Sequence, residues 1–212
     1  GKVGIRVPDH PLVLRVVEFV GGPITATSAN ISGRPAPSTA REALNQLGNA
    51  CVFDSRIPEA IEYYREVLDL LEEHPDQVFA RSFATQNLGY CLVVEGELER
   101  GIETIHEAIR LMQEAGAEGY VAESYIDLCY GYLELGDLDS ARKYGEAGLE
   151  RATETRQIRN AHYLLGEVAY KQGDSASAEF HFEHLSKFYP DFPQLKNVLL
   201  ALDLRKMVNL KL

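Results

Sequence analysis

Two histidines near the end of the chain, His181 and His184, are three residues apart, and imidazoles at that spacing on one helix can share a metal ion. No third ligand at a typical spacing accompanies them, so solvated or partly packed histidines are the favoured interpretation and a shared metal is the alternative. The sequence contains none of the motifs GxxxxGKS/T, GxGxxG, HExxH or GxSxG. No pair of nucleophile and base can be proposed either. We therefore predict a protein that is not an enzyme and that needs no metal or other cofactor.

A dipeptide that ends in a small side chain recurs along the chain and organises the rest of it. The four copies are Leu47-Gly48, Leu88-Gly89, Leu128-Cys129 and Leu165-Gly166. Successive copies are 41, 40 and 37 residues apart. Each copy is followed by a turn and by a second stretch with apolar residues at spacings of three and four, which is typical of an amphipathic helix. A period of about 40 residues that is built from two helices predicts a solenoid.

This pattern resembles the tetratricopeptide repeat (TPR). A small residue recurs at matched positions of the expected first and second helices, where it lets the two helices cross closely: Gly48, Gly89, Cys129 and Gly166, then Ala60, Gly101, Ala141 and Ala178. We predict a mainly α fold, a right-handed α-solenoid of about four TPR-like helix pairs within residues 39–191. The predicted pairs span 39–73, 76–115, 117–153 and 155–190. Glycines in the last three turns are expected to take positive φ and to end the first helices.

Residues 192–212 are predicted to form one more amphipathic helix that caps the array, because an open solenoid needs a polar end. Its apolar positions are Leu195, Val198, Leu199, Leu202 and Val208, and its basic residues are Lys196, Arg205, Lys206 and Lys211. A basic amphipathic helix can also lie on a membrane surface, which is the less favoured alternative.

The resemblance to TPR proteins implies a concave groove lined by the first helix of each pair. Aligning the repeats nominates ten peptide-binding residues: Asn45, Asn49, Gln86, Asn87, Tyr90, Asp127, Tyr130, Tyr163, Glu167 and Tyr170. Amide side chains can bond an extended peptide backbone through donor and acceptor together, and tyrosines add contact area at little entropic cost. Ordinary polar lining without a ligand is the alternative for each residue.

The charges expected in this groove limit the kinds of peptide that it can bind. Some TPR proteins hold a partner's C-terminal carboxylate with basic groove residues, but here those positions are Asn45, Glu123 and Asp127. We therefore expect the groove to reject acidic C-terminal tails and to favour a polar or basic peptide, with salt weakening the binding.

Composition excludes several classes of partner. The 212 residues carry a net charge of −11, and the part after residue 53 is the acidic one, so we expect no nucleic-acid binding. No run of eighteen apolar residues and no signal peptide is present, which predicts no membrane partner and a cytoplasmic protein. Cys51, Cys91 and Cys129 fall in successive first helices without a CxxC or zinc spacing, and we expect them to be buried, reduced thiols.

The first 38 residues differ from the repeats. They suggest a strand, a helix, a second strand and a loop, which is part of an α/β domain. The segments GIRVPDHP at 4–11 and GPITATSANISG at 22–33 resemble the YrdC-like threonylcarbamoyl-adenylate synthases. That resemblance implies ATP binding in the service of tRNA modification, with Arg6, Ser28 and Asn30 at the nucleotide. The family's upstream half, with its Lys-x-Arg motif, has no counterpart here, so we expect 1–38 to be an incomplete α/β fragment.

Two functional hypotheses follow from these residues. The first is a protein–protein interaction scaffold that binds a peptide or partner protein in its concave groove. The alternative is a remnant or split part of a threonylcarbamoyl-adenylate synthase that binds ATP once a partner completes it. A homo-oligomer formed through the open N-terminal edge of the array is a further possibility.

Overall fold

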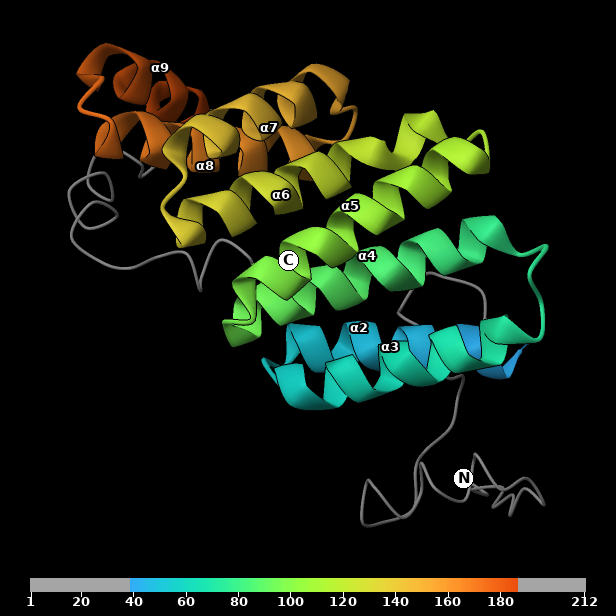
Figure 1. Cartoon of the computed structure of the whole chain (residues 1–212). Coiled ribbons are helices and arrows are strands. Elements are labelled where there is room, and N and C mark those ends of the chain that lie inside the picture. Colours follow the sequence, from blue (N-terminus) through green and yellow to red (C-terminus); the bar gives the residue numbers. More distant parts are fainter. Residues whose placement is uncertain (1–38, 187–212) are drawn as a thin grey trace, which may run out of the picture.

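The computed structural model describes residues 39–186, and these form paired helices that stack in a row (Figure 1). The helices are α2 (Ala40–Phe53), α3 (Ile57–Glu72), α4 (Val78–Glu95), α5 (Leu98–Glu114), α6 (Val121–Leu135), α7 (Leu138–Arg151), α8 (Thr155–Lys171) and α9 (Ser175–Ser186), with a 3₁₀ turn, η1, at Glu118–Tyr120. The predicted mainly α architecture of paired helices is confirmed. The expected α/β fragment 1–38, with Arg6, Ser28 and Asn30, and the expected capping helix 192–212 lie outside the described residues.

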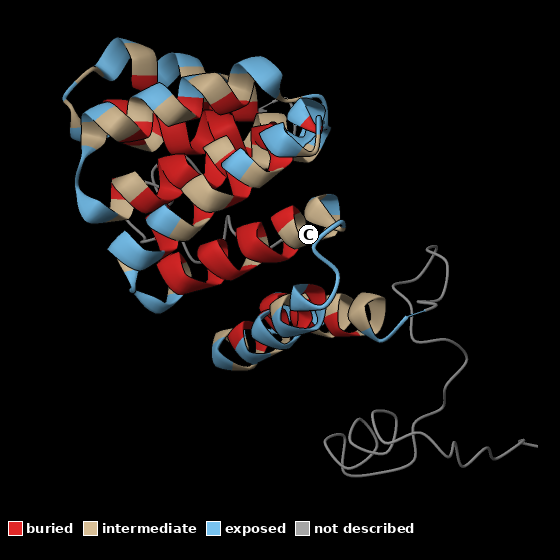
Figure 2. Ribbon diagram, turned by 45° about the vertical axis from the view of Figure 1, so that its right-hand side comes forward, coloured by how far each residue is buried: buried red, intermediate tan, exposed pale blue. Residues whose placement is uncertain are grey.

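Each helix packs against the next along the chain, and first helices also contact each other across pairs, α4 with α6 and α6 with α8. Buried residues occur along the stacked helices (Figure 2). One cluster of them extends from Cys51 in α2 to Leu185 in α9, and two smaller clusters contain Leu44 and Met112. In this part of the chain, no helix is long and apolar enough to cross a membrane.

Local sequence explains where the helices begin and end. Gly96, Gly136 and Gly173 take the left-handed conformation, with φ of 96°, 86° and 78°, directly after a first helix or one residue later, as predicted. Asp137 then caps α7, because its carboxylate accepts a hydrogen bond from the Ser140 backbone N–H at 3.1 Å. Hydrogen bonding to the Ser140 side chain, and then to its backbone N–H, lowers the pKa of Asp137, as expected for a carboxylate that is hydrogen-bonded when ionised.

The small residues do let the two helices of a pair approach closely. A Cβ atom at Gly48 would lie 2.7 Å from the Tyr64 ring, and one at Gly166 would lie 2.6 Å from the Phe182 ring. The third pair reverses the arrangement, because Cys129 replaces the first-helix glycine and Gly145 replaces the bulky second-helix residue. A Cβ at Gly145 would lie 2.9 Å from Cys129 Sγ, so small and large residues exchange sides while the helix spacing is kept.

The three cysteines are buried, as predicted, and no disulfide joins them within the described residues. Burial raises the pKa of the Cys51 and Cys129 thiols, because it disfavours the thiolate. Burial therefore holds these thiols in the neutral form, and they pack as small core side chains.

Candidate functional site

Three rows of side chains, one on each of the first helices α4, α6 and α8, form the candidate site. Residues three and four apart share a helix face, and each row follows that spacing. The α4 row is Phe79, Phe83, Gln86 and Tyr90; the α6 row is Tyr120, Glu123, Asp127 and Tyr130, with Tyr120 as the N-cap of α6; the α8 row is Arg156, Asn160, Tyr163, Glu167 and Tyr170. We call these the inner rows.

The α4 and α6 rows meet along their length. The Gln86 amide donates a hydrogen bond to the Asp127 carboxylate at 3.1 Å, and both side chains are buried. One turn further on, the buried rings of Tyr90 and Tyr130 lie 6.4 Å apart between centroids. Burial first, and then the Asp127 charge, raises the pKa of Tyr90, so its hydroxyl stays neutral.

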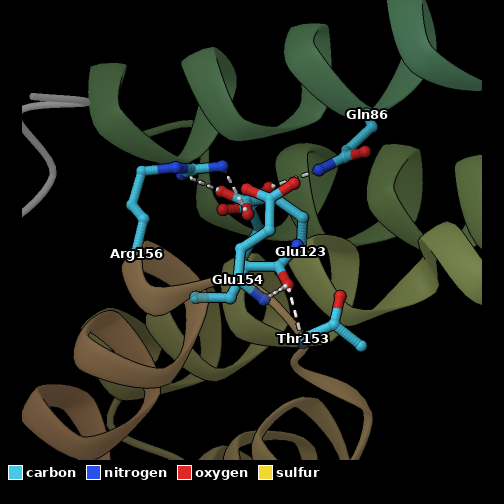
Figure 3. A network of polar contacts seen from close by, with 7 residues as sticks. Gln86, Glu123, Thr153, Glu154 and Arg156 are labelled. Atoms are coloured by element: carbon cyan, nitrogen blue, oxygen red, sulfur yellow. Dashed lines mark hydrogen bonds and ion pairs between the residues drawn. The ribbon is translucent and has the colours of Figure 1, made fainter.

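The α6 and α8 rows are joined by an ion pair between Glu123 and Arg156 (Figure 3). Arg156 Nη1 donates to Glu123 Oε1 at 2.6 Å and Nη2 donates to Oε2 at 2.9 Å, a bidentate geometry. Burial by itself would lower the pKa of Arg156, but the hydrogen bonds and charge of Glu123 more than offset this, so the pKa is raised. Glu154 caps α8 beside this pair in a capping box with Gln157.

The α8 row contains a buried acceptor with no partner. Asn160 is only 7% exposed, and its Oδ1 atom has no hydrogen-bond partner among the described residues. A buried carbonyl oxygen without a donor is unfavourable by about 1–3 kcal/mol. The α8 row therefore holds a carbonyl oxygen whose acceptor capacity the described residues leave unused.

Three aromatic rings near the N-terminal ends of α4 and α6 form a cluster that is partly open to solvent. The ring centroids of Phe79 and Phe83 are 4.9 Å apart. The centroid of the Tyr120 ring lies 5.4 Å from that of Phe79 and 5.7 Å from that of Phe83, and all three pairs are edge to face. Phe79 is 45% exposed and Tyr120 is 56% exposed. We call these three residues the aromatic triad.

The ten predicted groove residues differ widely in exposure. Gln86, Tyr90, Asp127, Tyr130 and Tyr163 are buried, Asn45, Asn49, Asn87 and Glu167 are partly buried, and Tyr170 is exposed. Seven of the ten lie in the inner rows together with Arg156, Glu123 and the triad. Asn49 lies outside these rows. Its Oδ1 accepts a 2.7 Å hydrogen bond from the Tyr64 hydroxyl, which connects α2 with α3. Their role in peptide binding stays a prediction.

Sequence reasoning missed Phe79, Tyr120, Arg156 and Asn160. Tyr120 precedes α6, and Phe79 and Arg156 lie in the first turns of α4 and α8, well before the small residues on which the repeats were aligned. All four lie on the helix faces of Gln86, Glu123 and Tyr163, at steps of three and four residues toward the N-terminus. Extending the predicted groove residues by that spacing would have included them.

A third histidine lies beside the two that the sequence singled out. His162 of α8 joins the two histidines of α9: its Nδ1 lies 3.0 Å from His181 Nδ1, and its ring stacks on His184 at 4.4 Å. Burial lowers the pKa of His181, and the neighbouring His184 lowers it further, so the neutral form is favoured. Within residues 39–186, no group of three or more metal-ligating side chains is arranged to hold an ion.

Comparison with solved structures supports the class of fold. The helical part resembles the Rap conjugation gene regulator of plasmid pLS20 in complex with the Phr* peptide, with a TM-score of 0.66 and 15% identity over 80% of this chain and 48% of that chain. It resembles the apo form of RapI with the same TM-score and identity, over 93% and 74% of the two chains. PilW, a type IV pilus biogenesis factor, matches with a TM-score of 0.56 and 18% identity over 75% and 67%. The helical region is thus a TPR-like solenoid.

The N-terminal part has a different relationship. Residues 1–80 match the YrdC-like family described as telomere recombination. Threonylcarbamoyl-AMP synthase of Vibrio cholerae is 51% identical over 47 residues, which is 22% of this chain and 25% of that protein. The Bacillus subtilis enzyme is 49% identical over 45 residues, 21% and 13% of the two chains. This chain therefore spans about a quarter or less of the synthases it matches. The family range also includes α2 and α3, which here form the first helix pair of the solenoid.

Proposed function

We propose that this protein binds an extended peptide, or a peptide-like segment of a partner protein, along the inner rows of α4, α6 and α8. The observation that carries the proposal is the buried, unpartnered Asn160 Oδ1 between the row residues Arg156 and Tyr163. A peptide N–H or a basic side chain would supply the missing donor. We also propose that the helical part acts by binding and not by catalysis.

The rows offer a ligand two kinds of surface. The exposed ends, at the aromatic triad and at Tyr170, give contact area that is already open to solvent. The buried middle, where Gln86 bonds Asp127, gives rigidity, and a ligand that reaches it has to exchange contacts made within the rows. The Rap regulator with a bound Phr* peptide shows that a solenoid of similar fold can hold a peptide, which supports the proposal without naming this chain's ligand.

The charge of the site favours a polar or basic ligand. The inner rows contain three carboxylates, Glu123, Asp127 and Glu167, against one cation, Arg156. An acidic peptide would therefore be repelled, whereas a peptide with lysine or arginine would be attracted and would lose affinity in salt.

Selection from a display library of random twelve-residue peptides, with the full chain as bait, tests this function. We expect enrichment of basic sequences that bind with micromolar affinity by fluorescence anisotropy and weaken about tenfold between 50 and 500 mM salt. Asn160→Leu should weaken the enriched peptides about tenfold, because a buried acceptor is lost. Gln113→Leu, an exposed amide on α5, is the matched control and should change nothing. Failure to enrich any peptide, or selection of acidic ones, would contradict the proposal.

A second candidate function rests on the 51% identity of the N-terminal part to threonylcarbamoyl-AMP synthase. We propose that the residues resembling the nucleotide motif, Arg6, Ser28 and Asn30, retain affinity for ATP, alone or with a completing chain. Under this proposal ATP with Mg²⁺ and threonine raises the melting temperature of the full chain by a few degrees, and Ser28→Ala with Asn30→Ala abolishes the shift. An unchanged melting temperature at millimolar ATP would exclude nucleotide binding by the chain alone.

A further inference from the structure

The aromatic triad has a chemical environment that singles out one kind of ligand side chain. Its rings are in mutual edge-to-face contact, with centroids 4.9 to 5.7 Å apart, so the side chains pack against one another and leave outer ring surface to solvent. Exposed aromatic surface of this kind binds either apolar groups or cations that can stack on a ring.

Charges next to the triad favour the cation. Asp76 precedes Phe79 by three residues and Glu118 precedes Tyr120 by two, and both acidic side chains are exposed. The cations in this region already have partners: Arg81 Nη2 donates to the Leu71 carbonyl oxygen at 2.8 Å, and Arg156 is paired with Glu123. The chain segments that carry Phe79 and Tyr120 therefore add two exposed carboxylates, whose negative charge an incoming cation would partly neutralise.

Guanidinium suits this combination better than ammonium does. It is planar, weakly hydrated and able to stack on an aromatic face while it donates hydrogen bonds to a carboxylate in its own plane. The protein uses the same contact elsewhere, where the Arg151 guanidinium carbon lies 5.4 Å from the centre of the Tyr125 ring.

We propose that the aromatic triad is an arginine subsite, at which an arginine side chain of the bound peptide stacks on Phe79 and Tyr120 and pairs with Asp76 or Glu118. The subsite rests on the proposed peptide-binding function, since it lies at the end of the same inner rows. It extends that function by naming the side chain that the ligand must carry and the place where that side chain lies.

NMR titration with small probes tests the subsite without a known peptide. The probes are the N-acetyl amides of arginine, lysine, citrulline and leucine, added to the full chain with ¹³C-labelled phenylalanine and tyrosine rings. We expect saturable shifts of the triad resonances with the arginine probe alone, at a dissociation constant of about 1–10 mM. Phe180, an exposed ring on α9, is the internal control and should not respond.

Variants separate stacking from charge. Tyr120→Ser should weaken the arginine probe about fivefold, and Asp76→Asn with Glu118→Gln should weaken it further while leaving the rings in place. Circular dichroism verifies that each variant remains folded. An equal response to leucine or citrulline amide, or no saturable shift at the triad, would overturn the subsite. The library selection reports separately on peptide binding, because peptides that enrich without a dependence on Tyr120 would leave that function intact and refute the subsite.

Discussion

Gly101→Val is expected to lower the free energy of unfolding by about 3 kcal/mol, because it forces apart α4 and α5. A Cβ atom at position 101 would lie 2.6 Å from Val93 Cγ2, 2.8 Å from the Val93 backbone nitrogen and 2.9 Å from the Gly89 carbonyl oxygen. Two of these atoms belong to the backbone of α4, which cannot move without opening the interface between α4 and α5.

Urea unfolding followed by circular dichroism at 222 nm measures this loss. Gly119→Val is the matched control, because a Cβ at position 119 meets no atom within 4 Å and its φ is not positive. Its stability should stay within about 0.5 kcal/mol of the wild type. A Gly101→Val protein as stable as the wild type would show that the α4–α5 interface is looser than the structure indicates.

Arg156→Met is expected to lower the free energy of unfolding by about 2 kcal/mol, because it leaves the Glu123 carboxylate without its countercharge. The Glu123 side chain is 13% exposed and that of Arg156 is 30% exposed, so solvent screens the pair only in part. The contact between α6 and α8 should be the part that is destabilised. Amide hydrogen exchange should therefore be faster in the first turns of both helices.

A double-mutant cycle with Glu123→Gln isolates the pair itself. We expect the double variant to be more stable than the sum of the single losses predicts, by about 1–2 kcal/mol. Arg100→Met is the control, because Arg100 of α5 pairs with Glu97, the N-cap residue of the same helix, and the two side chains are 57% and 44% exposed. No measurable change is expected there. Additive single losses at positions 123 and 156 would mean that the bidentate contact contributes little.

Much of the solenoid follows from local chemistry that a sequence displays directly. Gly96, Gly136 and Gly173 take positive φ because a first helix ends there and only glycine adopts that conformation without strain. The recurring small residues were predicted to mark helix crossings, and Gly48 and Gly166 do so. Cys129 fits at the third crossing although it is larger than glycine, because Gly145 on the facing helix leaves room for its side chain.

The candidate site was only partly predictable. Aligning the repeats placed Gln86, Asp127, Tyr90 and Tyr130 on one surface, but not the Gln86–Asp127 hydrogen bond or the burial of all four. Those depend on how far each helix pair is rotated and shifted against the next. The partner of Glu123 is 33 residues away, although the repeats are 37 to 41 apart, so no fixed period would have found it.

The sequence by itself determined the class of fold, a solenoid of paired helices. Its small residues, turn glycines and amphipathic spacing act within one helix or one hairpin, where a few neighbouring residues decide the conformation. Only the tertiary structure decided the site: which side chains of α4, α6 and α8 meet, which are buried, and that three aromatic rings from two segments form one exposed cluster. The physical reason is that contacts between pairs sum the packing of many side chains, so the register of one helix against another is set by the whole interface rather than by any local motif.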